Sequence, residues 1–211
     1  MIALRLSCAL AAVIYGIFIC TRHKQPLFLK IVLYGMASHL LGTVFLACYA
    51  LVYHTTPSGF HVGYFGHIGA YFFLLSSYYG AMDRLADGGE KAYRRHRAAA
   101  LAAPLALLAV LLYCVLNTGL IPNLPLLLFA IPMGGTLFFA LKHALLPDVE
   151  LGIIRVMRPY NLAILLFCLF EALPQLPFLT EGMSSAARGI GCLLLLVLLP
   201  VAERGVRKWL I

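Results

Sequence analysis

Two ionisable side chains, His67 and Glu171, stand within long stretches of the chain that are otherwise almost uncharged. An imidazole and a carboxylate can form an ion pair, transfer a proton or hydrogen-bond a polar ligand. Either group is costly in an apolar environment without a partner, so its presence there is a hypothesis of function. The pair predicts a polar site in which a protonated His67 faces an ionised Glu171, or in which a neutral Glu171 is hydrogen-bonded.

Other polar residues accompany this pair at helical spacing. Tyr64, His67 and Tyr71 are three and four residues apart, which places them on one face of a helix. Gln175 follows Glu171 by one helical turn, and two arginines occur in apolar stretches near the chain ends. The residues that we expect to form a ligand-binding pocket are His67, Glu171, Tyr71, Tyr64, Gln175, Arg188 and Arg5.

A purely structural interpretation of the same residues stays open. Tyrosines near the ends of membrane helices form an ordinary interfacial belt, and arginines there can extend to lipid headgroups. A single buried glutamate can join two helices by a hydrogen bond. His39 is expected to have such a packing role, because Gly42 and Thr43 follow it closely.

No cofactor, metal site or catalytic residue is predicted. Haem would need two axial histidines at one depth, and counting residues from the span ends places His39 and His67 at different depths. The six cysteines are scattered singly without a CxxC pair, which favours small buried side chains over disulfides or zinc ligands. HExxH, GxSxG and P-loop motifs are missing, and no nucleophile stands out. Acid–base chemistry on lipids by histidine and glutamate stays an alternative.

The elements that must position these side chains are membrane-spanning helices. Hydrophobic residues make up 63% of the chain and its mean hydropathy is +0.94, which exceeds what a soluble domain of 211 residues can bury. A bilayer core needs about 20 helical residues. We therefore predict an all-α, polytopic membrane protein that is one domain over residues 1–211, with seven spans near 2–20, 31–53, 61–82, 99–116, 121–141, 159–178 and 186–203.

The basic residues predict the orientation of these spans. Fourteen of the 16 Lys and Arg residues fall in four short segments, 22–30, 84–97, 142–158 and 204–208. Short loops rich in Lys and Arg stay on the cytoplasmic side, so the N-terminus is expected outside and the C-terminus inside. Because this charge is divided among short links, we expect contact with lipid headgroups rather than with nucleic acid. The expected location is the plasma (inner) membrane.

Two inner links carry further expectations. The loop over residues 83–96 is predicted to be solvated, and its arginines could contact a cytoplasmic partner protein. Residues 144–157 are expected to lie along the inner membrane interface, with Pro159 opening the next helix. The partner-contact candidates are Arg84, Arg94, Arg95 and Arg97, and the prolines that could kink helices are Pro104, Pro125, Pro132, Pro174 and Pro177.

Three classes of function fit these expectations. The first is a receptor or sensor that binds an unknown small molecule in an outward-facing pocket between helices. The second is a small-solute transporter, or its substrate-binding membrane subunit, in which the same pocket alternates access. The third is a membrane assembly subunit without a ligand, in which His67 and Glu171 only pack.

Overall fold

The computed structural model is mostly helical over the residues that it describes, which are 1–211 without 23–24, 58, 80–82, 84–86, 88, 90, 148–151, 177–178 and 211. No strand occurs among them, so the prediction of an all-α protein is confirmed. The helices are α1 (Ile2–Arg22), α2 (Leu27–Tyr53), α3 (Gly63–Ser77), α5 (Arg94–Ala100), α6 (Ala102–Thr118), α7 (Leu124–Leu145), α8 (Ile153–Ala172) and α9 (Glu181–Leu210), with short 3-10 segments η2 (Lys91–Tyr93) and η3 (Leu173–Gln175).

Six helices in the described part of the chain are long and apolar enough to cross a membrane. They are α1, α2, the continuous run Lys91–Thr118, α7, the run Ile153–Gln175 and α9. The described α3 has 15 residues, fewer than the about 20 that a crossing needs. The chain is therefore a multi-pass membrane protein on the length and composition of its helices.

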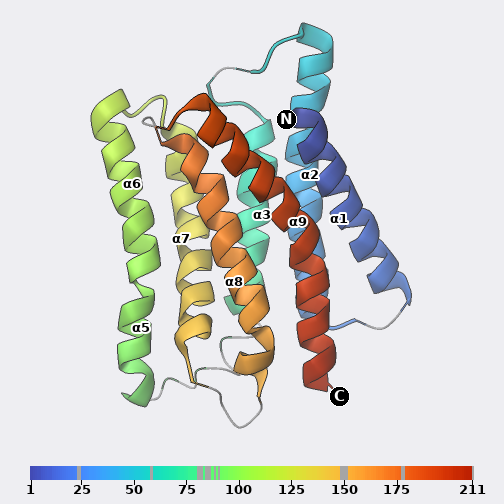
Figure 1. The fold of residues 1–211 in the computed structure, drawn as a ribbon, viewed down its shortest axis with the longest axis vertical. Helices are drawn as coiled ribbons and strands as arrows, with labels where there is room; N and C mark the ends of the chain where they lie inside the picture. The colour runs from blue at the N-terminus through green and yellow to red at the C-terminus, as the bar shows by residue number, and fades with distance from the viewer. Residues whose placement is uncertain are drawn as a thin grey trace.

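Successive helices of the chain alternate in direction, with α5 and α6 running the same way one after the other, and the two termini lie at opposite ends of the bundle (Figure 1). Helices α1, α2, α3, α7, α8 and α9 pack in sequence around a ring, which closes where α9 contacts α1. Helices α5 and α6 pack on the outside of this ring, against α7. Four ring helices, α1, α2, α3 and α8, supply the polar site described below.

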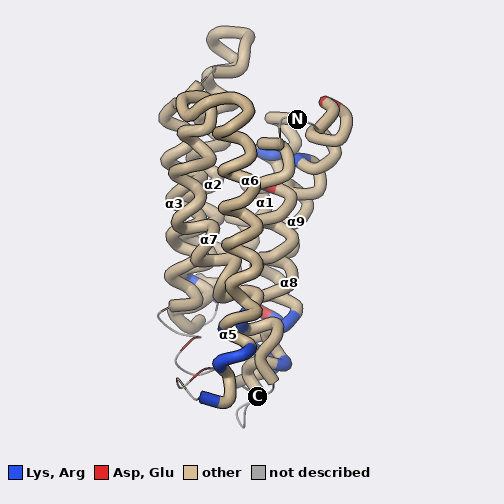
Figure 2. Tube along the Cα trace, turned by 90° about the vertical axis from the view of Figure 1, so that its left-hand side faces the viewer, with Lys and Arg blue, Asp and Glu red and all other residues tan. Residues whose placement is uncertain are grey.

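Most lysines and arginines gather at the end of the bundle that holds the C-terminus (Figure 2). The opposite end, where the N-terminus lies, carries few basic positions (Figure 2). This asymmetry agrees with the clustering of basic residues in the sequence. For clarity, the two ends are called the N-terminal end and the C-terminal end of the bundle.

Small residues bring α2 and α3 into close contact. A Cβ atom on Gly66 would collide with the backbone of Gly42, and a Cβ atom on Gly42 would lie 2.5 Å from the carbonyl oxygen of Gly63. The Ser38 hydroxyl also donates to the Gly66 carbonyl oxygen at 2.8 Å. Membrane helices use such small residues because close backbones gain dispersion contacts and interhelical hydrogen bonds. This contact sets His39 of α2 beside His67 of α3.

Prolines have different consequences at different positions. Pro104 lacks the N–H that would reach the carbonyl of Ala100, and the helix is interrupted at Leu101 between α5 and α6. Pro132 lies inside α7, as expected of a kink candidate. Pro125 was expected to kink a helix as well, but it lies in the first turn of α7, where a missing N–H costs nothing. Pro174 belongs to η3 after α8, and Pro177 is outside the described residues.

The inner segment 144–157 differs from its prediction. It was expected as a link between two spans along the membrane interface, a location that stays a prediction, but α7 extends to Leu145 and α8 already begins at Ile153. Ile154 and Met157 are buried at 1% and 3% exposure, so this first part of α8 is core. Pro159 consequently lies inside α8 rather than at its start. Arg158 adds an anchor, because its guanidinium donates to the carbonyl oxygen of Leu146 at 3.1 Å.

Candidate functional site

Four ionisable side chains from four helices form one hydrogen-bonded chain near the N-terminal end of the bundle. The Arg5 guanidinium on α1 binds a carboxylate oxygen of Glu171 on α8 at 2.5 Å. Its Nε atom donates to Nε2 of His39 on α2 at 3.2 Å. Nδ1 of His39 lies 3.2 Å from Nδ1 of His67 on α3. The chain therefore runs Glu171, Arg5, His39, His67.

The arginine fixes the tautomers of both histidines. Arg5 can only donate, so Nε2 of His39 must accept and carries no proton. The proton of a neutral His39 is then on Nδ1, which donates to Nδ1 of His67. Nδ1 of His67 is an acceptor in turn, which leaves its proton on Nε2. This assignment follows from the donors and acceptors alone.

Two buried polar atoms near the His67 end of this hydrogen-bonded series have no protein partner. Nε2 of His67 and the hydroxyl of Tyr71 have no hydrogen-bond partner among the described residues. His67 is 5% exposed and Tyr71 is 2% exposed. A buried donor or acceptor that stays unpaired costs about 1–3 kcal/mol, so such groups normally bind water or a ligand. Both residues line the same cavity.

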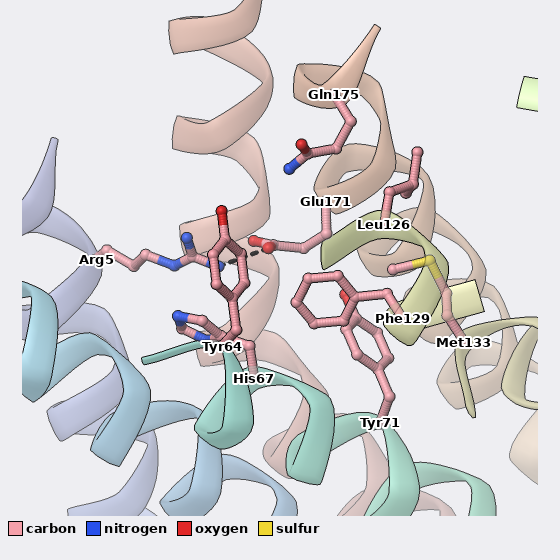
Figure 3. Close-up of a pocket in the computed structure, with 9 residues that line it drawn as sticks. All are labelled: Arg5, Tyr64, His67, Tyr71, Leu126, Phe129, Met133, Glu171 and Gln175. Atoms are coloured by element: carbon pink, nitrogen blue, oxygen red, sulfur yellow. Dashed lines mark hydrogen bonds and ion pairs between the residues drawn. The ribbon is translucent and has the colours of Figure 1, made fainter. Parts of the chain in front are cut away.

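This cavity is a narrow recess beside the ion pair. Figure 3 shows Arg5 and Glu171 extending toward one another across it, with His67 and Tyr71 pointing up from α3. Its volume is about 50 Å³, which is room for one or two waters or a single functional group. The residues that line the recess are Arg5, Tyr64, His67, Tyr71, Leu126, Phe129, Met133, Glu171 and Gln175.

A wider vestibule joins the recess toward the N-terminal end. Its volume is about 330 Å³, at the lower end of the range for small-molecule sites. It shares Arg5, Tyr64, His67 and Gln175 with the recess, so the two form one site. The remaining residues that line the vestibule are Met1, Ile2, Leu46, Thr56, Pro57, His61, Pro174, Arg188 and Cys192.

The charges of the site do not cancel. Arg5 and Glu171 neutralise one another, with side chains 21% and 15% exposed. Arg188 is exposed and has no acidic partner among the described residues. The vestibule therefore carries an excess positive charge close to His39 and His67. Such a surface favours a ligand with hydrogen-bond acceptors and a negative group.

The structure places all seven predicted pocket residues around this one site. The expected pairing of His67 with Glu171 is wrong, because Arg5 holds the glutamate and His39 holds His67. The expected difference in depth between the histidines is also wrong. A count of residues along each span does not reveal that α2 and α3 cross closely at Gly42 and Gly66. This crossing brings His39 and His67 to the same level.

His39 is thus the site residue that the sequence analysis missed. Its side chain is 1% exposed and contacts both Arg5 and His67. The glycines at 42, 63 and 66 were the available signal, because they indicate a close approach of α2 and α3. In the described residues, no group of three or more His, Cys, Asp or Glu side chains could hold a metal ion.

A second polar cluster lies toward the C-terminal end of the bundle and was also missed. The ammonium of Lys142 on α7, 3% exposed, pairs with Asp83 and with Asp87, the latter at 3.2 Å. His143, fully buried, lies 3.1 Å from the Asp83 carboxylate. We call Asp83, Asp87, Lys142 and His143 the inner cluster. It ties the segment after α3 to the end of α7.

One of the residues predicted to contact a cytoplasmic partner, Arg97, contacts this cluster. Arg94 and Arg95 are exposed on α5, whereas Arg97 is partly buried and lies 3.6 Å from Asp87. Arg84 is outside the described residues. Arg97 therefore belongs to the inner ion-pair network as much as to any free surface.

Packed side chains link the site to the inner cluster. Tyr71 stacks against Phe167 of α8 with ring centroids 6.0 Å apart. Seven residues after Tyr71, at the C-cap of α3, the Tyr78 hydroxyl donates to Asn161 of α8 at 2.9 Å. The Tyr78 ring also lies 5.5 Å from that of His143. Helix α3 thus contacts α8 at two levels and reaches the inner cluster at its end.

Comparison of the chain with protein families, with curated proteins and with solved structures finds no significant match. What can be said of its function therefore rests on the geometry of the site.

Proposed function

We propose that the chain is a seven-helix membrane protein that binds a small polar molecule in the recess and vestibule and transmits this binding to the opposite membrane face. In this proposal α3 also crosses the membrane, which brings the number of crossings to seven. The N-terminus is outside, and the C-terminus is inside the cell. The protein resides in the plasma (inner) membrane. The clustering of basic residues at the C-terminal end supports this orientation.

The observation that carries the proposal is the pair of unpartnered polar atoms on α3. The Nε2 proton of His67 and the Tyr71 hydroxyl line a recess whose other wall is an ion pair. Such groups need a bound water or a bound ligand, and the adjoining vestibule of about 330 Å³ has room for more than water. The ligand needs an acceptor for His67, and Arg188 favours a negative group at its other end.

Sensing fits the geometry better than transport. Tyr71, Phe129 and Phe167 close the floor of the recess with ring centroids 5.7–6.0 Å apart. Below them the core is apolar, with Leu74 fully buried. A ligand that draws Tyr71 toward the recess would bias the position of α3 against α8, and Tyr78 would carry that change toward the inner cluster.

Transport is the second candidate, and internal prolines favour it. Pro132, Pro159 and Pro200 lie inside α7, α8 and α9, three neighbouring helices of the ring. Such prolines weaken helices locally, which would allow one half of the helix bundle to rock against the other. An assembly role without a ligand is the third candidate, and it predicts no specific binding.

The test is a thermal-shift screen of the purified protein with small carboxylates, amino acids and phosphate monoesters. The proposal predicts stabilisation by at least one class, and a smaller stabilisation of Tyr71→Phe at the same ligand concentration. Tyr79→Phe is the matched control, because Tyr79 is 71% exposed in the same stretch of chain. Stabilisation that is the same in all three proteins, or none with any compound, would contradict the pocket.

Vesicles reconstituted with the protein then separate the first two candidates. Binding of the identified compound without uptake supports sensing. Uptake down a concentration gradient, with a raised half-saturation concentration in Tyr71→Phe and an unchanged one in Tyr79→Phe, would replace sensing by transport.

A further inference from the structure

A separate groove lies between α1 and α9, far along both helices from the pocket. Its volume is about 270 Å³, and it is open to the surroundings of the bundle. On α1 it begins two to three turns after the last pocket residue, Arg5, and it ends at the helix terminus. The residues that line the groove are Tyr15, Phe18, Ile19, Arg22, Glu203 and Arg207.

The one acidic side chain of this groove is already neutralised. The Glu203 carboxylate accepts a hydrogen bond from the Tyr15 hydroxyl at 2.7 Å and pairs with Arg207 at 2.6 Å. Glu203 is 7% exposed, whereas the Arg207 side chain is 58% exposed. Arg207 therefore keeps donors free of the carboxylate, because a guanidinium has five N–H groups.

Arg22 adds a second positive charge on the facing helix. Its guanidinium carbon lies 4.0 Å from the centroid of the Phe18 ring, which orients the planar group over an aromatic face. No acidic residue of the described chain pairs with Arg22. Arg22 and Arg207 therefore flank the groove with a net positive charge, since Glu203 offsets only one of them.

Apolar side chains of α1 extend from this groove along the membrane-facing surface. Ile14, Ile17 and Phe18 are 58%, 51% and 49% exposed, and they precede Arg22 on the same helix by about one to two turns. Large apolar side chains at this exposure on a membrane helix contact acyl chains. The groove thus combines a site for an anionic group with a neighbouring surface for hydrocarbon.

We propose that this groove binds the phosphate of an anionic glycerophospholipid, with its acyl chains along the exposed face of α1. Arg22 and Arg207 contact the phosphate oxygens, and Tyr15 holds Glu203 in place to orient Arg207. Guanidinium groups suit this task because they bind phosphate in a bidentate manner. Basic pockets between membrane helices on the cytoplasmic side hold anionic headgroups in this way. The lipid site is independent of the ligand pocket.

Native mass spectrometry of the protein released from nanodiscs tests the proposal. We expect phosphatidylglycerol to remain bound at least about tenfold more than phosphatidylcholine, equal to about 1.4 kcal/mol. Arg22→Gln combined with Arg207→Gln should abolish this preference. The matched control is Arg94→Gln combined with Arg95→Gln, which removes two exposed charges elsewhere in the chain.

Three results would overturn the lipid site. Equal loss of phosphatidylglycerol in both double variants would show an unspecific surface charge. Equal retention of both lipids by the unaltered protein would show no headgroup recognition. Displacement of the lipid by millimolar glycerol phosphate would assign the groove to a free phosphate ester. If the double variant fails to fold, Arg22→Gln alone is the test and should lower the preference at least about threefold. This single variant leaves no buried carboxylate unpaired, because Arg22 has no acidic partner among the described residues.

Discussion

The Nε atom of Arg5 donates to Nε2 of His39, and this bond determines where the protons of the neighbouring imidazole lie. Because His39 must accept, His67 presents its Nε2 proton to the recess. A residue near the chain start therefore sets the hydrogen-bonding character of a site on α3. The consequences of this relationship can be measured separately for stability, geometry and binding.

Arg5 and Glu171 should depend on one another in their contributions to the free energy of unfolding. Glu171→Gln leaves Arg5 partly buried without its counter-charge, and we expect a loss of about 3 kcal/mol in the free energy of unfolding. Arg5→Met should cost a similar amount. Arg5→Met combined with Glu171→Met should lose less than either single variant. Unfolding in mixed micelles measures this, and additive losses would show that the two groups act independently.

Removing the hydroxyl of Tyr71 should have the opposite effect to removing that of Tyr78. Both side chains are buried, but the Tyr71 hydroxyl has no protein partner while that of Tyr78 donates to Asn161. Tyr71→Phe should leave stability unchanged or raise it without ligand. Tyr78→Phe should lower it by about 1 kcal/mol, since a buried acceptor loses its donor. Equal losses in the two variants would mean that Tyr71 has a partner.

Gly66→Ala should disturb the site through packing alone. The added Cβ collides with the backbone of Gly42, so α2 and α3 must separate, at a cost of about 1–3 kcal/mol. The bond between His39 and His67 should lengthen, which a changed ring nitrogen resonance of His67 reports. Gly189→Ala is the control, because nothing lies within 4 Å of its added Cβ. A tolerated Gly66→Ala with unchanged resonances would refute the close contact.

The inner cluster should make stability depend on pH. Burial alone raises the pKa of the Asp83 carboxyl, but hydrogen bonds and charges from His143 and Lys142 outweigh it, and the pKa falls below its ordinary value of 3.8. A lowered pKa contributes stability above pH 3.8 that is lost as the pH falls through the folded-state pKa. Thermal midpoints of the unaltered protein and Asp83→Asn should therefore differ at pH 6 and converge as the pH is lowered below 3.8. A constant difference would contradict the pairing.

The sequence predicted what depends on periodicity and hydropathy. Apolar length indicated the helices, and the spacing of Tyr64, His67 and Tyr71 indicated one face of α3, which lines the recess. Lateral contacts were not predictable in this way. His39 lies in the site because glycines let α2 and α3 cross closely. Arg5, rather than His67, pairs with Glu171 because α1 closes the ring beside α9.

Helix ends were the other source of error. Pro159 suggested a helix start, but α8 begins six residues earlier. The earlier start is stabilised because it buries the apolar side chains of Ile153, Ile154 and Met157 in the core. Glu203 was overlooked as a buried acid because it lies next to Arg204 at the expected end of a span. Helix α9 continues to Leu210 and carries Glu203 against Tyr15 of α1. Tertiary packing, which one sequence does not display, decided both cases.

The most direct measurement of the central claim is the dissociation constant of the first stabilising compound for the unaltered protein, Tyr71→Phe and Tyr79→Phe. Loss of one hydrogen bond should weaken binding to Tyr71→Phe by at least about fivefold, or 1 kcal/mol, while Tyr79→Phe binds normally. Equal dissociation constants for the three proteins would contradict a ligand seated between His67, Tyr71 and the Arg5–Glu171 pair.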